Sequence, residues 1–180
     1  MPAEDYQPIE TEIFAVYGFR LRIPNDWRVE FNPKGDRIKG DVAFHSPKKN
    51  RIFLSWGPLK EANKRFKTVD EQRDWGVKQM EKSQGIKKAT ISESKSINVC
   101  GHRALLSRII VTGGSGFLSP KQRDRVVYSM YLYCPNSARY YVLYAALNSP
   151  EEYPDFQKLF DTVAQSMVCH PSPDDNLRDG

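Results

Sequence analysis

The sequence predicts an α+β domain, a three-layer α/β/α sandwich built around a mainly antiparallel sheet. Three observations predict this fold. Apolar and polar residues alternate with a period of two through most of the chain, which is typical of strands. The last two predicted strands, RVVYSMYLYC and RYYVLYAAL, are apolar on both faces, so we expect them to be central strands covered on both sides. Two segments with helical periodicity, one in mid-chain and one near the C-terminus, supply the outer layers.

The first strand is predicted within YGFRLRIPNDW, residues 17–27, where three apolar residues alternate with Arg20 and Arg22. Pro-Asn-Asp then supplies turn chemistry, because proline fixes φ and the two polar side chains hydrogen-bond their own backbone. The alternation resumes in WRVEF. We therefore expect residues 17–31 to form a hairpin or a corner between two strands.

A second hairpin is predicted in GDVAFHSPKKNRIFLSW, with its turn at residues 47–50. A helix follows, because Thr68 and Glu71 form a T-x-x-E capping box. We expect Gly85 to end this helix in the left-handed conformation.

The C-terminal helix is predicted from five apolar residues at positions i, i+3, i+4, i+7 and i+11. They are Phe156, Leu159, Phe160, Val163 and Met167. Before it, Pro135-Asn136-Ser137 joins the two central strands by a tight turn. The helix and the strands together predict one domain over residues 12–168, with an acidic N-terminal tail at 1–11 and a polar C-terminal tail at 169–180.

The charge of the chain is unevenly distributed. The total is +5, but residues 1–12 contribute −4 and residues 171–180 contribute −2, so residues 13–170 carry +11. A basic body of this kind favours acidic partners.

Three cysteines are too few for a disulfide framework and indicate a reducing compartment, so we expect a cytoplasmic protein. No run of 18 apolar residues exists, so no membrane span is expected. MPAEDYQPIETE lacks the apolar segment of a secretory signal.

No motif in the chain matches a known catalytic or cofactor-binding signature. TGGSGF, residues 112–117, has phenylalanine where a nucleophile elbow needs glycine, so we interpret it as a loop between strands. The acidic residues on or beside the predicted helices assemble no catalytic triad with His45 and Ser46, and are interpreted as solvated carboxylates. The sequence therefore predicts no catalytic residue and no cofactor.

Cysteine and histidine occur close together twice, in Cys100-Gly101-His102 and in Cys169-His170. These residues would supply four zinc ligands, but the spacing matches no zinc finger or ribbon. We interpret Cys134 as a small core residue and these two histidines as surface groups, and expect no metal site.

Basic side chains form the candidate partner-binding surface. The candidates are Arg20, Arg22, Lys48, Lys49, Arg51, Lys121, Arg123 and Arg125. Four interleaved aromatic residues, Trp56, Phe66, Trp75 and Tyr131, would either stack bases or belong to the core. The cations, in turn, would either bind a partner or serve only as a solvated face.

The order of these elements resembles the PsbP/Mog-type fold family, which includes the extrinsic PsbP protein of photosystem II and a nuclear-import factor that binds Ran. The resemblance rests on YGFRLRIPNDW, the hairpins before the mid-chain helix, the long antiparallel strands and the closing YPDFQKLFDTVAQSM, over about residues 12–168. It implies a non-enzymatic binding or assembly role, without indicating which residues bind. The helix-grip fold is the rival architecture, and the two hairpins before the first helix argue against it.

We therefore expect a non-catalytic binding or adaptor protein that holds an acidic protein on a basic surface. A module that binds nucleic acid without sequence preference is the alternative. A small-ligand carrier or enzyme with a pocket between sheet and helix is the third possibility.

Overall fold

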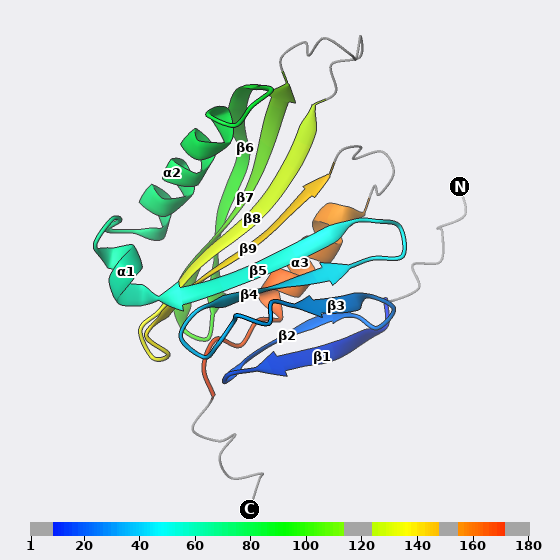
Figure 1. The fold of residues 1–180 in the computed structure, drawn as a ribbon, viewed down its shortest axis with the longest axis vertical. Coiled ribbons are helices and arrows are strands. Elements are labelled where there is room, and N and C mark those ends of the chain that lie inside the picture. The colour runs from blue at the N-terminus through cyan, green and yellow to red at the C-terminus, as the bar shows by residue number, and fades with distance from the viewer. Residues whose placement is uncertain (1–8, 114–123, 148–154, 172–180) are drawn as a thin grey trace, which may run out of the picture.

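The computed structural model describes residues 9–113, 124–147 and 155–171. Seven strands form one antiparallel sheet in the order β3-β4-β5-β9-β8-β7-β6, and β1 and β2 form a separate hairpin (Figure 1). The strands of the large sheet are β3 (Arg28–Phe31), β4 (Gly40–His45), β5 (Arg51–Pro58), β6 (Ile86–Val99), β7 (His102–Gly113), β8 (Arg125–Cys134) and β9 (Arg139–Leu147). The hairpin consists of β1 (Thr11–Val16) and β2 (Phe19–Pro24).

The helices lie on both sides of the large sheet, which confirms the predicted three-layer arrangement. They are α1 (Leu59–Asn63), α2 (Val69–Glu81) and α3 (Phe156–Gln165). Helix α2 packs on β6, β7 and β8. Helix α3 and the β1–β2 hairpin cover the opposite face, where they share the largest core cluster with alternate residues of β4, β5, β8 and β9.

The N-terminal hairpin differs from the predicted one. Strand β2 pairs with β1, not with β3, and Tyr17 and Gly18 form the turn between them with φ values of 51° and 81°. The Pro-Asn-Asp segment is instead the corner at which the chain leaves the hairpin and enters the large sheet. Of the two alternatives for residues 17–31, the corner is therefore correct. Thr11, assigned to the N-terminal tail from the sequence, is the first residue of β1.

The other predicted elements are confirmed in their main features. The β4–β5 hairpin forms as expected. The Thr68 hydroxyl accepts a hydrogen bond from the Glu71 amide and so caps α2. Helix α2 ends at Glu81, so Gly85, with φ of 81°, lies in the turn to β6 and not at the helix cap. All five residues of the C-terminal stripe are buried, with Met167 just beyond the end of α3.

Helix α2 lies close to Tyr131 of β8 at Gly76. A Cβ atom on Gly76 would lie 2.6 Å from the hydroxyl oxygen of Tyr131, whose ring is buried beneath the helix. Such a separation is well below van der Waals contact, so either the buried Tyr131 ring or the helix would have to shift. The absence of a side chain at Gly76 therefore leaves room for the Tyr131 hydroxyl under α2.

We expect Gly76→Ala to destabilise the protein by about 1–3 kcal/mol through overpacking, despite the roughly 1 kcal/mol that alanine gains over glycine in a helix. In a Tyr131→Phe background the clashing hydroxyl is absent, so Gly76→Ala should there be neutral or stabilising. Urea unfolding of the four proteins of this double-mutant cycle measures the difference. An equal loss of unfolding free energy in the wild-type and Tyr131→Phe backgrounds would contradict a close contact between position 76 and the Tyr131 hydroxyl.

Candidate functional site

The predicted basic residues fall into two groups on opposite faces of the molecule. Arg20 and Arg22 are exposed on the outer face of the β1–β2 hairpin, on the α3 side of the sheet. The backbone of Arg20 pairs with Val168, and the Arg22 amide donates to the Ser166 hydroxyl. This hairpin is therefore held against the segment that follows α3.

The second group lies at one end of the large sheet. Lys48 and Lys49 occupy the turn between β4 and β5, Arg51 begins β5, and Arg125 begins β8. Antiparallel pairing of β5 with β9 and of β9 with β8 places the starts of β5 and β8 at the same end. The two remaining candidates, Lys121 and Arg123, lie outside the described residues, as does most of the TGGSGF segment.

The sheet face on the α2 side is not covered by α2 over β5 and β9. Helix α2 contacts β6, β7 and β8, whereas the short helix α1 contacts β5 and β9 where β5 ends and β9 begins. On β9, Tyr144 and Ala146 are exposed and Val142 is partly exposed. The prediction that both central strands are covered on both faces is thus correct for β8 and wrong for the Tyr144–Ala146 part of β9, because α2 packs over β6, β7 and β8 and not over β9.

Phe53 of β5 and Tyr144 of β9 stack on this uncovered face. Their ring centroids are 5.0 Å apart with the planes inclined by 15°, and Tyr144 is 39% exposed. Strand alternation places Arg51 on the same face as Phe53, and Arg125 on the same face as the α2-packed Val127. We call the set of Arg51, Phe53, Tyr144 and Arg125 the open-face patch.

Three of the four aromatic residues considered for base stacking belong to the core. Trp56, Phe66 and Tyr131 are all buried, and burial raises the pKa of Tyr131 to about 12. Trp75 is 40% exposed, and the Arg65 guanidinium lies 4.4 Å from its ring centroid. The exposed Phe53–Tyr144 pair was not identified from the sequence, because alternation alone does not show which face of a central strand is left bare.

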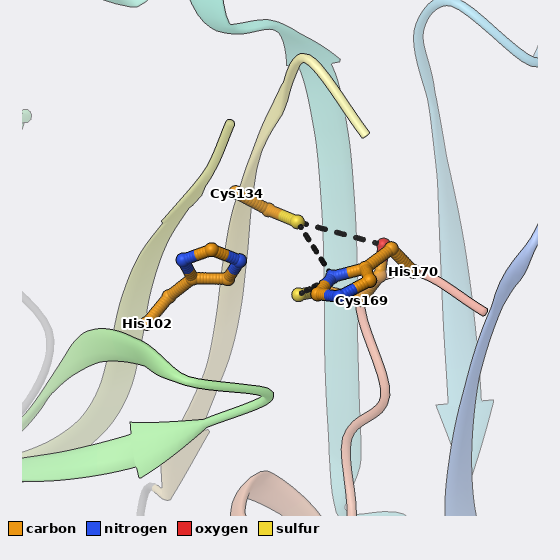
Figure 2. A group of neighbouring side chains, drawn as sticks. All are labelled: His102, Cys134, Cys169 and His170. Atoms are coloured by element: carbon orange, nitrogen blue, oxygen red, sulfur yellow. Dashed lines mark hydrogen bonds between the residues drawn. The ribbon is translucent and has the colours of Figure 1, made fainter. Parts of the chain in front are cut away.

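Cysteine and histidine side chains gather at the other end of the sheet. One ligand atom each from His102, Cys134, Cys169 and His170 lies within 4.8 Å of the corresponding atoms of the other three (Figure 2). His170 Nδ1 is 3.4 Å from the sulfur of Cys134 and 3.4 Å from that of Cys169. We call these four residues the Cys/His cluster.

Each member of the Cys/His cluster is positioned by an element of the fold. His102 begins β7 directly after the turn at Cys100 and Gly101, which have φ values of 52° and 82°. Cys134 ends β8, and extending the β7–β8 register by two residues puts it across from His102. The last two members follow α3 and the bridge between Val168 and β2.

The sequence interpretation of these residues is correct for Cys134 and only partly correct for the two histidines. Cys134 is fully buried, as expected of a core residue. His102 and His170 are only partly exposed, and their rings lie 5.3 Å apart. Cys169 is fully buried as well, although it was assigned to the C-terminal tail. The fourth member of the Cys/His cluster is Cys134, which is distant in sequence from both Cys-His segments, and not Cys100, which the sequence analysis considered.

Hydrogen bonds hold the Cys/His cluster together and make the two thiols unequal. The interaction with the Cys169 thiol lowers the pKa of Cys134, and the same interaction raises the pKa of Cys169. The Tyr141 hydroxyl donates to the Cys169 carbonyl at 3.1 Å. The Cys169 amide donates to the sulfur of Cys100 at 3.4 Å. Cys100 therefore supports the backbone of the cluster from outside.

Several carboxylates expected to be solvated are instead engaged in ion pairs. Asp70 forms a bidentate pair with Arg103, which lowers the pKa of Asp70. Asp161 of α3 pairs with Lys95 of β6 at one wall of a pocket of about 300 Å³ between α3 and the sheet. This volume is at the small end of the range for ligand sites.

Comparison with known proteins supports the fold assignment. No family model and no curated protein matches the chain. Among solved structures, cyanobacterial PsbP (CyanoP) from Synechocystis sp. PCC 6803 is similar, with 15% identity, a TM-score of 0.59, and coverage of 93% of this chain and 96% of that one. The Ran-binding protein Mog1p of Saccharomyces cerevisiae is similar with 8% identity, a TM-score of 0.60, and coverage of 89% and 95%. The chain therefore has the PsbP/Mog-type fold, as the sequence resemblance implied.

None of the helices in the described part of the chain has both the length and the apolar character needed to cross a membrane.

Proposed function

We propose that this chain is a non-catalytic binding or adaptor protein that holds an acidic protein against the open-face patch. The observation that carries the proposal is the stacked pair of Phe53 and Tyr144 on a sheet face that α2 leaves uncovered. Arg51 and Arg125 lie on the same face at the end of the sheet. The fold gives further support, since Mog1p, which has a similar fold, is a Ran-binding protein.

The aromatic pair has the properties of an interface anchor. Aromatic and arginine side chains are enriched where proteins bind one another, and they dominate the binding energy when a partner excludes water from them. The Phe53 and Tyr144 rings are already ordered by stacking in the free protein. A partner would therefore lose little side-chain entropy in binding to them.

The charge around the patch favours an acidic partner. Arg51 and Arg125 have no ion-pair partner within the described ranges 9–113, 124–147 and 155–171. Lys48 and Lys49 extend the positive charge into the adjacent turn. Positive potential of this kind steers acidic partners and rejects basic ones.

Three free cysteines favour a reducing compartment, so we propose the cytoplasm as the location of the interaction.

The two groups of arginines provide a matched test of the proposed surface. Arg51→Glu with Arg125→Glu reverses two charges in the open-face patch. Arg20→Glu with Arg22→Glu makes the same change of net charge on the opposite side of the molecule. We expect the first pair to reduce retention of an acidic partner at least tenfold and the second pair to change it less than twofold. Both double variants should keep the wild-type melting temperature, since all four side chains are exposed.

The measurement is quantitative mass spectrometry of the proteins that co-purify with each variant from the cells that produce the protein. Binding of a fluorescent single-stranded oligonucleotide is measured in parallel at several salt concentrations. Equal loss of protein partners with both double variants would contradict the open-face patch. Tight oligonucleotide binding with a steep salt dependence would favour the nucleic-acid alternative instead.

A further inference from the structure

We propose that the Cys/His cluster is a structural zinc site, in which His102, Cys134, Cys169 and His170 bind one Zn²⁺ ion and fix the segment after α3 to the end of the sheet. This inference is independent of the proposed function, since the Cys/His cluster and the open-face patch lie at opposite ends of the sheet.

The donor set is the first argument. Two thiolates and two imidazoles form one of the usual ligand sets of structural zinc. The four residues come from the start of β7, the end of β8 and the segment after α3. All four tetrahedral positions would be filled by protein, so no position remains for water or substrate. This is typical of a structural site and not of a catalytic one.

The distances are the second argument. With Zn–S near 2.3 Å and Zn–N near 2.1 Å, a tetrahedral site separates each sulfur from each nitrogen by about 3.6 Å. The observed separations from His170 Nδ1 to the sulfurs of Cys134 and Cys169 are both 3.4 Å. These three ligand atoms are therefore near tetrahedral spacing, and the ligand atom of His102 lies within 4.8 Å of each of them.

His102 supplies a third and independent argument. Its Nε2 atom is buried and has no hydrogen-bond partner among the described residues. A buried polar atom without a partner is unfavourable, and native proteins rarely tolerate one without a reason. One ring nitrogen of His102 points toward Cys134 and His170 (Figure 2). Coordination to a metal ion would satisfy that nitrogen.

The neighbouring groups would keep the ligands in place. The amide of Cys169 is hydrogen-bonded to the sulfur of Cys100, and its carbonyl accepts from Tyr141. Cys134 and His102 are held by the ends of paired strands. Outer hydrogen bonds that orient the ligands in this way are typical of metal sites.

The test uses the full chain, reduced and freed of metal, titrated with Co²⁺ and then with Zn²⁺. We expect one equivalent of Co²⁺ to produce the intense visible absorption of a tetrahedral cobalt–thiolate centre, and one equivalent of Zn²⁺ to abolish it. Cys169→Ser and His102→Ala should each weaken Zn²⁺ binding at least 100-fold. Cys100→Ser is the matched control, because this sulfur accepts the Cys169 amide hydrogen bond without being a ligand, and a serine hydroxyl can accept the same bond. It should weaken Zn²⁺ binding less than tenfold. Circular dichroism checks that each variant is folded.

The Co²⁺ titration of the wild-type chain decides the matter even where a variant fails to fold. Absence of the tetrahedral cobalt spectrum in the folded, reduced chain would overturn the proposal. An equal loss of affinity for Cys100→Ser and Cys169→Ser would also overturn the assigned ligand set. A disulfide between Cys134 and Cys169 in the chain purified without reductant would also count against the proposal, if the same chain, once reduced, bound no added Zn²⁺.

Discussion

Replacing Trp56 by alanine is expected to cost about 3–5 kcal/mol of unfolding free energy, a large part of the stability of a domain this size. Trp56 is 2% exposed and packs between the β1–β2 hairpin and the large sheet. Its ring centroid lies 5.1 Å from that of Phe19 and 6.0 Å from that of Phe31. Its indole N–H donates to the Asp36 carbonyl at 2.9 Å. The truncation would leave a cavity and an unpaired carbonyl together.

Trp75→Ala is the matched control for this substitution. The same atoms are removed, but Trp75 is 40% exposed and contacts chiefly Phe66 and Arg65. We expect a loss of about 1 kcal/mol or less. Thermal unfolding of both variants should show a decrease of about 10 °C for Trp56→Ala and of a few degrees for Trp75→Ala. Similar decreases for the two variants would contradict the role of Trp56 as the link between hairpin and sheet.

The fold can be predicted from the sequence wherever one face of a strand or helix is buried, because burial then makes apolar and polar residues alternate regularly. In β2 the apolar residues Phe19, Leu21 and Ile23 are all buried, and the arginines between them are exposed. The partner strand β1 was not predicted. None of its six residues, TEIFAV, is fully buried and three are exposed, so burial imposes no clear alternation on this segment. Its turn also lacks a standard signal, since Tyr17 adopts a positive φ that tyrosine rarely takes.

The two candidate sites show why single-sequence reasoning identifies residues better than surfaces. His102, Cys134 and Cys169 are separated by more than thirty positions at each step, and no local pattern indicates that they meet. The β7–β8 register would have placed His102 across from Cys134 if the pairing had been known. Likewise, the six candidate basic residues within the described ranges are all exposed, but their division between two faces depends on the pairing of the strands that carry them.

The last large effect is expected at Phe160, where α3 packs on the sheet. Phe160 is 1% exposed, and its ring centroid lies 5.8 Å from that of Tyr128 on β8. The ring also lines the pocket of about 300 Å³ beside the Lys95–Asp161 ion pair. Phe160→Ala should lower the unfolding free energy by about 3–5 kcal/mol. The substitution removes buried apolar surface and enlarges the cavity, and the packed layers on either side can relax only in part to fill it.

Lys158→Ala on the same helix tests whether this loss is due to packing and not to helix propensity. The Lys158 side chain is 73% exposed and forms a long i,i+3 pair with Asp155 at 3.6 Å. Its replacement should change stability by about 0.5 kcal/mol or less, since alanine is at least as good a helix former. Urea unfolding should therefore show a much lower midpoint for Phe160→Ala alone. A small loss at Phe160 would mean that α3 does not form the third layer, and the core beneath the hairpin would then have to be closed by another segment.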